Sequence, residues 1–357
     1  MLKIGELKIT PQILSAISEI DEFKGKWENI ENFSPEKLQM LKKISTIESI
    51  GSSNRIEGNK LTDKEVEKLL SNISTKSFDS RDEEEVVGYA ELLDTIFENY
   101  EIIPLSENYV KQLHKILLQY TQKDESHRGE YKKVSNSIVA FDSEGKEIGV
   151  VFETTSPFDT PTQMENLLQW TKKNLEDNFY HPLIVIGIFV VNFLAIHPFQ
   201  DGNGRLSRAI TAMLLLQKGY SYIPYSSVES IVERNKEGYY RALRKTQSTI
   251  NSKKTDYEYW LSFFLSTLLK QKRHLEIKIK GIKDEKISAK GNADVSLTEQ
   301  KILSLFERQN CLTSPEIAEL LSLNLETAKK AVKRLALKGY IIKNGSTKGA
   351  WYSKNQA

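Results

Sequence analysis

Residues 197–208 read HPFQDGNGRLSR, and this polar stretch lies between two largely apolar runs, 183–196 and 209–216. A histidine, a carboxylate, two glycines and two arginines therefore sit at the junction of two segments that we expect to be buried. Buried elements hold their ends in fixed positions, so such a junction is suited to keep reactive side chains in one geometry.

The tetrapeptide DGNG at 201–204 predicts an anion-binding turn. Glycine adopts positive φ without strain, so successive backbone N–H groups can point into one concavity. If a helix begins near Arg205, its N–H groups and dipole add to that site, and Arg205 and Arg208 share roughly one helix face. Asp201 is then a candidate ligand for Mg²⁺, and His197 a candidate proton acceptor. Taken singly, His-Pro and Asp-Gly-Asn-Gly are equally typical of an ordinary helix end and turn.

The whole stretch resembles the signature of the Fic (filamentation induced by cAMP) family, His-Pro-Phe-x-Asp/Glu-Gly-Asn-Gly/Lys-Arg, at every specified position. The resemblance implies a protein adenylyltransferase, which moves AMP from ATP to a Ser, Thr or Tyr hydroxyl of a target protein. It implies His197 as the general base and Asp201 as the ligand of Mg²⁺ between the α- and β-phosphates. The other implied ATP contacts are Gly202, Asn203 and Gly204 in the anion hole, with Asn203 on the α-phosphate, Arg205 on the β-phosphate and Arg208 on the γ-phosphate.

A second segment, SNRIEG at 53–58, resembles the inhibitory motif of the same family, Ser/Thr-x-x-x-Glu-Gly/Asn. The resemblance implies that Ser53 and Glu57 belong to an inhibitory helix and that Glu57 pairs with Arg208, which keeps the γ-phosphate from seating productively. A bidentate pair of this kind would occupy the donors that ATP needs. A surface glutamate before a turn is the alternative. Since some such glutamates also orient a water for AMP removal, the direction of the reaction stays open.

Two further segments fit the same fold. Residues 137–155 alternate in a way that predicts a hairpin, and the resemblance implies a flap on which the target protein docks by strand addition; an ordinary surface hairpin is the alternative. Residues 235–243 resemble the family's Tyr-Tyr-x-Ala-Leu helix, which implies that Tyr239 and Tyr240 line the adenine side of the ATP pocket. Both tyrosines are equally explained as core aromatics at helical spacing.

Residues 295–357 predict a winged helix-turn-helix. The pattern favours a first helix that opens at 297–298 and runs over 300–309. Two more helices follow over 317–321 and 323–338, and then a short hairpin joins 339–342 to 350–352. In this fold the third helix, 323–338, enters a DNA major groove. The side chains it would offer are Thr327, Lys329, Lys330, Lys333 and Arg334. The same fold also serves in protein docking or dimerisation, and a lysine-bearing helix face is usually only solvated.

The composition agrees with an intracellular protein. The chain has 357 residues, a net charge of +2 and one cysteine, Cys311. The length favours two or three structural units, and the charge gives no overall electrostatic reason to expect nucleic acid binding. A single cysteine and the lack of an apolar signal segment at the start indicate the cytoplasm. The run 183–196 is too short to span a membrane. His114, His181 and His274 are interpreted as structural, and no two have zinc-ligand spacing.

Together these features predict a mainly α-helical protein. Its expected regions are an N-terminal helical region with the inhibitory motif (1–95), a Fic-type catalytic core with the flap (96–250), a helix and linker (251–294) and a winged-helix domain (295–357). Two functions remain: an autoinhibited adenylyltransferase, and a nucleotide-sensing DNA-binding transcriptional regulator. His197 favours the enzyme, because a pure sensor needs no base. A homodimer is implied by the resemblance alone, and another nucleotide or a phosphorylated diester stays open as the donor.

Overall fold

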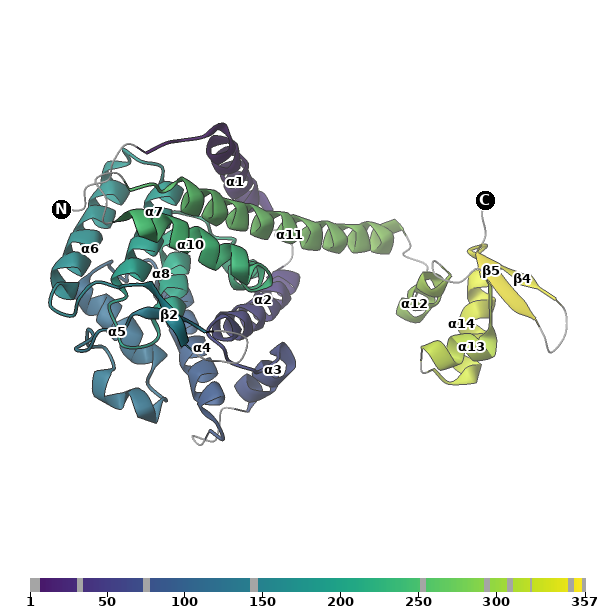
Figure 1. Cartoon of the computed structure of the whole chain (residues 1–357). Coiled ribbons are helices and arrows are strands. Elements are labelled where there is room, and N and C mark those ends of the chain that lie inside the picture. The colour runs from purple at the N-terminus through teal and green to yellow at the C-terminus, as the bar shows by residue number, and fades with distance from the viewer. Residues whose placement is uncertain are drawn as a thin grey trace. The chain divides into compact units, whose positions relative to one another are not determined.

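The computed structural model describes residues 7–30, 35–72, 78–141, 147–250, 255–291, 296–306, 311–321, 323–345 and 350–354. They are mainly helical and form two compact units, Met1–Lys278 and Ile279–Ala357 (Figure 1). The boundary between the units falls within one helix, α11 (Glu258–Gly291). The predicted mainly α-helical fold is therefore confirmed. Among the residues described, no helix is long and apolar enough to cross a bilayer.

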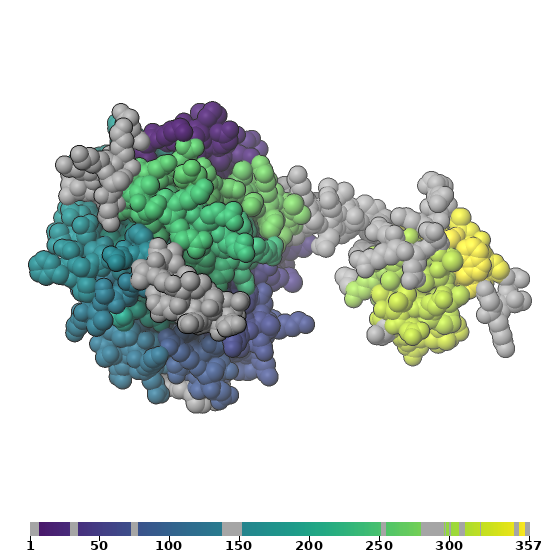
Figure 2. Space-filling view, viewed as in Figure 1, coloured from purple at the N-terminus to yellow at the C-terminus, as the bar shows by residue number. Residues whose placement is uncertain are grey.

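The first unit is built from helices and one hairpin. Its helices before α11 are α1 (Pro11–Ile30), α2 (Pro35–Ile56), α3 (Asp63–Ser71), α4 (Arg81–Asn99), α5 (Glu107–Leu117), α6 (Thr160–Asp177), α7 (Pro182–Ile196), α8 (Asn203–Gln217), α9 (Val228–Arg234) and α10 (Lys236–Ile250). Two short 3₁₀ turns, η2 (Gln122–His127) and η3 (Ile223–Tyr225), lie between them. Figure 2 shows α10 and α11 (green) at the surface of this unit beside α1 (purple). Arg273 of α11 forms an ion pair with Glu19 of α1 at 3.0 Å.

The helix α7 forms the centre of the first unit. It is apolar on every side, and all residues from Leu183 to Ile196 are buried, as expected for a helix surrounded by other helices. The helices α6 and α8 pack against it. The start of α11 approaches α7 closely at Gly187, whose carbonyl accepts a hydrogen bond from Trp260 Nε1 at 2.6 Å. The carboxyl end of α7, where the polar stretch begins, is thereby fixed.

The predicted hairpin is present as β1 (Ile138–Phe141) and β2 (Glu147–Phe152), which pair antiparallel with Ile138 opposite Phe152. Both strands lie within the predicted range 137–155, and the residues between them, 142–146, lie outside the described part of the chain. The helix α10 contacts β2, so the hairpin lies against the first unit near the carboxyl end of α7.

The second unit is a winged helix-turn-helix, as predicted. Its elements are α12 (Leu297–Leu305), β3 (Cys311–Thr313), α13 (Ser314–Leu320), α14 (Leu325–Leu337), β4 (Ile341–Asn344) and β5 (Trp351–Lys354). They enclose a core that includes Ile302, Ile317, Val332 and Leu335. The first helix opens at Leu297, as expected, with Ser296 and Glu299 forming a capping box. The sheet has a third strand that was not predicted, β3, which pairs with β5.

The helices α4 and α5 meet at one glycine. A Cβ atom on Gly88 of α4 would lie 2.1 Å from the carbonyl oxygen of Leu117, at the end of α5. Backbone cannot yield as a flexible side chain can, so any larger residue must push the helices apart. This contact matters for the site described below, because α4 and α5 both carry residues that surround Asp201.

We expect Gly88→Ala to lower the free energy of unfolding by about 1–3 kcal/mol, since overpacking forces a backbone shift. Gly25→Ala on α1 is the matched control, because a Cβ there meets no atom within 4 Å. That variant should be stabilised by about 0.5–1 kcal/mol through the helix preference of alanine. Urea unfolding of both variants checks this pair. Equal effects of the two substitutions would show that the α4–α5 contact is not close.

Candidate functional site

His197 occupies the junction at the end of α7. It is the C-cap of that helix in the left-handed conformation, with φ 52° and ψ 60°, and its N–H donates to Phe193 O at 2.9 Å. Its Nδ1 lies 3.3 Å from Leu194 O. A carbonyl only accepts, so the neutral ring carries its proton on Nδ1 and leaves the lone pair on Nε2. Burial, with Lys132 acting in the same direction, lowers the pKa of His197.

Asn203 closes the loop that follows His197. Its Oδ1 accepts from Phe199 N at 2.9 Å, and its Nδ2 donates to Phe199 O at 2.7 Å. The side chain is only 2% exposed. The resemblance assigned Asn203 to the α-phosphate. In this structure one N–H of its Nδ2 closes the loop, so its second N–H and its backbone N–H are the groups that could contact an anion.

The helix α8 begins at Asn203, two residues before the expected start, with Gly202 as N-cap at φ 78°. The first N–H groups of a helix have no intrahelical partner, and the helix dipole places partial positive charge there. Gly204 lies in this first turn, and a Cβ on it would come within 2.0 Å of Glu57 Oε1. A side chain at this position would displace the Glu57 carboxylate from the helix amino terminus. The predicted anion-binding turn thus faces the side chain of Glu57.

Asp201 is surrounded by positive charge. Its Oδ2 lies 2.7 Å from an Arg81 nitrogen and 3.6 Å from Arg205 NH2, and its Oδ1 accepts from Gly202 N at 2.6 Å. Burial by itself raises the pKa of this carboxyl, but Arg205, the Gly202 N–H and Arg81 together hold it below its ordinary value. Asp201 is therefore ionised at neutral pH. No cluster of three or more His, Cys, Asp or Glu able to hold a metal occurs among the described residues.

His114 supports this loop, a role that the sequence did not reveal. Its Nδ1 accepts from Gly129 N at 2.9 Å, its Nε2 lies 3.0 Å from Asp201 O, and its ring stacks on Phe199 at 3.8 Å. One nitrogen accepts, so the other donates to the Asp201 carbonyl. Burial lowers the pKa of His114 to about 4. The side chain holds the loop in place rather than binding metal or titrating near neutrality.

Arg208 meets both residues of the second motif. Its Nε donates to Ser53 Oγ and its NH2 to Ser53 O, both at 2.8 Å, and NH2 lies 2.9 Å from Glu57 Oε1. Burial by itself lowers the pKa of Arg208, but Glu57 raises it above its ordinary value. Arg205 is 2% exposed and pairs with Glu85 at 3.2 Å. The structure therefore brings together two segments that are about 150 residues apart in the sequence.

The polar stretch and Glu57 line one cavity of about 730 Å³, a size usual for small-ligand sites, whereas Arg208 and Ser53 are not among its lining residues. Of the predicted residues, it is lined by His197, Asp201, Gly202, Asn203, Gly204, Arg205, Tyr239, Tyr240 and Glu57. Gln247 and Arg244 of α10 also line it and were missed by the sequence analysis. Gln247 carried no signal, because a polar residue late in a helix is usually solvated.

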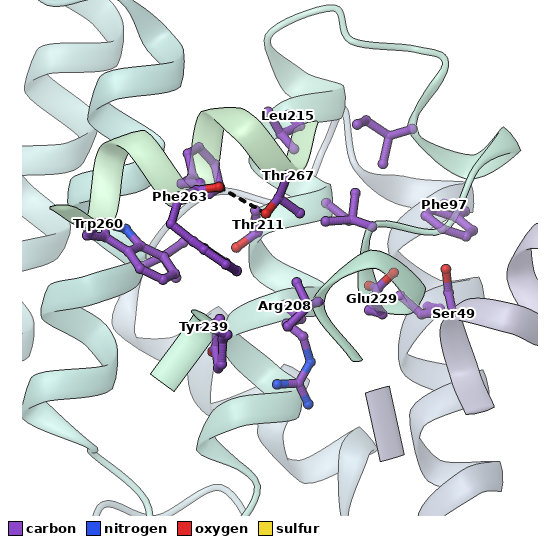
Figure 3. Close-up of a pocket in the computed structure, with 17 residues that line it drawn as sticks. Ser49, Phe97, Arg208, Thr211, Leu215, Glu229, Tyr239, Trp260, Phe263 and Thr267 are labelled. Carbon is purple, nitrogen blue, oxygen red and sulfur yellow. Dashed lines mark hydrogen bonds between the residues drawn. The ribbon is translucent and has the colours of Figure 1, made fainter. Parts of the chain in front are cut away.

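Tyr239 lines two cavities. Besides lining the large cavity, it lines a smaller, mainly apolar one of about 60 Å³ behind Arg208 (Figure 3). There its ring lies 5.8 Å from Trp260 and 5.9 Å from Phe263, centroid to centroid. The tyrosine is thus a core aromatic whose other side forms a wall of the site. The stem of Arg208 lines the same small cavity.

The candidate recognition helix α14 buries one face and exposes the other. Ala328, Val332 and Leu335 pack inward. The five residues that were expected to face DNA are all exposed. Arg334 Nε lies 3.1 Å from Glu299 of α12, and Lys329 Nζ lies 3.6 Å from Glu326.

Comparison with known proteins agrees with both units. Residues 104–215 match the family model described as Fic/DOC family, and residues 296–342 match one described as winged helix-turn-helix DNA-binding. A probable protein adenylyltransferase of Aquifex aeolicus (strain VF5) is 28% identical over 99 residues, which are 28% of this chain and 28% of that protein. The chain therefore spans less than a third of the curated relative that it matches.

Two solved structures share the fold. A Fic family protein from Desulfovibrio desulfuricans G20 aligns with a TM-score of 0.61 at 22% identity, over 99% of both chains. A Fic domain containing signaling protein from Bacteroides thetaiotaomicron VPI-5482 aligns with a TM-score of 0.60 at 24% identity, over 74% of this chain and 97% of that one. At these identities the likeness concerns the fold.

The role of His114 can be tested through stability. Because its pKa falls from 6.5 to about 4 on folding, the unfolded chain binds more protons between these values. The contribution of His114 to the free energy of unfolding is therefore complete above pH 6.5. It declines by roughly 3 kcal/mol as the pH falls to 4. His114→Phe should flatten this decline and cost about 1–3 kcal/mol at pH 7, because it leaves Gly129 N–H unpaired. Chemical unfolding at several pH values measures both, and an unchanged decline in the variant would refute the assignment.

Proposed function

The chain carries a Fic/DOC family domain over residues 104–215, and we propose that it is a protein adenylyltransferase that moves AMP from ATP to a hydroxyl side chain of a target protein. One observation carries the proposal. A neutral histidine, an ionised aspartate and two buried arginines meet at the amino terminus of α8, at or beside a cavity of nucleotide size. The name of the Aquifex aeolicus relative agrees with this activity.

The proposed reaction is a displacement at the α-phosphorus. The hydroxyl oxygen of the target forms a bond to that phosphorus, the bond to the α–β bridging oxygen breaks, and pyrophosphate leaves. His197 Nε2 takes the hydroxyl proton, since its lone pair is free in the tautomer that Leu194 O selects. Nucleotidyl transfer depends mainly on position and charge, which the fixed loop and the α8 amino terminus supply.

The arginines are suited to the outer phosphates. Arg205 Nε and Arg208 NH1 are buried and have no hydrogen-bond partner within the described part of the chain. Buried donors normally find acceptors, so these two point to a ligand rich in oxygen. In the proposed complex Arg205 contacts the β-phosphate and Arg208 the γ-phosphate. Tyr240, Arg244 and Gln247 line the same cavity and are placed for the nucleoside end.

Asp201 fits the requirements of Mg²⁺. The ion is commonly held in proteins by one or two carboxylates together with water and substrate phosphates, and the Asp201 side chain is ionised and partly exposed at the cavity. When bound there, Mg²⁺ would neutralise charge on the α- and β-phosphates. Arg81 contacts Oδ2 of Asp201 at 2.7 Å, so the ion has to compete with this guanidinium for the carboxylate.

Glu57 restrains the enzyme in this proposal. Its carboxylate lies against the first turn of α8 and pairs with Arg208, so it takes both the position and the donor that a terminal phosphate needs. Arg55, two residues earlier, is held by Glu233 of α9 through Nε at 2.7 Å and NH2 at 3.0 Å. The contact with α9 thus holds the segment that carries Glu57 close to the cavity.

Labelling with radioactive ATP tests the proposal. Glu57→Gly should raise AMP incorporation into the protein itself or a target at least tenfold, because it frees Arg208. Glu57→Gln should raise it less, since the amide still fills the space. Adding His197→Ala to Glu57→Gly should abolish incorporation. Undiminished labelling in that double variant would contradict the assignment of the base. Release of AMP from labelled target by the same variants measures the reverse reaction.

A second function rests on the winged helix. We propose that α14 contacts DNA, since its exposed face carries Lys330 and Lys333, for which no ion pair is found among the described residues. In an electrophoretic shift assay, Lys330→Glu with Lys333→Glu should weaken DNA binding at least tenfold at low salt and reduce the salt slope by about 2, through loss of two phosphate contacts. The control, Lys173→Glu with Lys301→Glu, changes the net charge equally. No DNA binding by the unmodified chain at low salt would reject this role.

A further inference from the structure

A buried lysine lies beside the catalytic loop and has no part in the reaction described above. Lys132 is 3% exposed, although lysine is rarely buried unless paired with an acid. Among the described residues no carboxylate forms an ion pair with it. Its Nζ donates instead to Asn136 Oδ1 and Thr154 Oγ1, both at 2.8 Å, and to Ile196 O at 3.0 Å. Three neutral acceptors satisfy the three protons of the ammonium group.

The acceptors belong to two different parts of the site. Asn136 precedes β1 and Thr154 follows β2, so they mark the two ends of the hairpin. Ile196 is the last residue of α7, directly before His197. Lys132 N also donates to Pro198 O at 2.8 Å, on the other side of the histidine. The lysine therefore joins both ends of the hairpin to the backbone on both sides of His197.

Asn136 reinforces the same connection. Its Nδ2 donates to Phe199 O at 2.7 Å and to His197 O at 3.3 Å, while its Oδ1 accepts from Lys132 and from Thr154 Oγ1. His197 holds a left-handed conformation that non-glycine residues seldom adopt. Such a conformation persists only where the surroundings impose it. The cluster of Lys132, Asn136 and Thr154 supplies that constraint from the hairpin side.

The charge of Lys132 also acts on the histidine. An ammonium group near His197 disfavours the imidazolium and keeps the ring in its neutral form, which is the form of a base. The negative charges of Glu57 and Asp201 act in the opposite direction and favour a higher pKa of His197. Burial lowers the pKa of Lys132 itself to about 8, so its charge is largely present at neutral pH.

We propose that Lys132 is a positioning residue that couples the hairpin to His197, holding Nε2 toward the cavity and the ring neutral. The proposal rests on the proposed function, because it treats His197 as the base, and it takes the hairpin as the docking surface for the target that the family resemblance implies. It gives a function to a buried ammonium group that takes no part in the proposed reaction. A target segment that pairs with the hairpin would then be fixed relative to the base through this cluster.

The test uses the full chain with Glu57→Gly, to which Lys132→Met is added. Methionine keeps the length of the side chain and removes the charge and the donors. Lys133→Met is the matched control, since the neighbouring lysine is exposed. The pKa of His197 is measured by NMR of the histidine rings, and kcat and KM for ATP by AMP transfer. We expect Lys132→Met to raise the His197 pKa and to lower kcat by about 10- to 100-fold through misplacement, with KM changed less than about twofold.

Two results would overturn the proposal. One is a His197 pKa and kcat in Lys132→Met equal to those of Lys133→Met, with kcat in both variants divided by the folded fraction from circular dichroism. The other is an equal loss in kcat and ATP affinity, as a general disturbance of the ATP site would give. If Lys132→Met does not fold, Thr154→Val removes one acceptor of the cluster and should lower kcat about threefold. The NMR measurement needs no activity. An enzyme that transfers no AMP but shows the His197 shift would therefore refute the proposed function and leave the role of Lys132 supported.

Discussion

The guanidinium of Arg208 is buried beside the amino terminus of α8, and the carboxylate of Glu57 lies against both. A buried cation needs a partner, and breaking such a pair leaves an uncompensated charge. A terminal phosphate could replace the carboxylate, because it offers the same charge and better acceptors at the same place. In the proposed function this position holds one anion, and Glu57 provides it when no nucleotide is bound.

The other contacts of the site hold the loop between α7 and α8 in place beside this pair. The apolar helix α7 fixes the starting point of the loop, and Asn203 closes it on Phe199. His114 holds the Asp201 carbonyl from α5, and Lys132 holds the other side from the base of the hairpin. Each of these bonds is satisfied within a buried setting, where loss of one partner costs more than the bond contributes. A rigid loop of this kind is suited to position the proposed base, His197, and the proposed Mg²⁺ ligand, Asp201, without reorganisation.

The sequence predicted the parts that are local and missed those that depend on distant contacts. The polar stretch at 197–208, the hairpin and the third winged-helix helix all follow from periodicity and turn residues within short windows. The Glu57–Arg208 pair could be predicted only through a family resemblance, since 151 residues separate the two. Arg81 and Lys132 had no local signal, because a lone cation is usually a solvated side chain. The strand β3 has three residues, and it pairs with a strand about 40 positions later in the sequence, so no hairpin pattern predicts it.

The central claim is that Glu57 takes the place of the terminal phosphate, and nucleotide affinity tests it most directly. Calorimetric titration of the full chain and of Glu57→Gly with AMP, ADP and ATP in the presence of Mg²⁺ separates the phosphate positions. We expect Glu57→Gly to tighten ATP binding at least tenfold, to tighten ADP binding much less and to leave AMP binding unchanged, since only the γ-phosphate reaches Arg208. An equal gain for all three nucleotides, or none for ATP, would contradict the account.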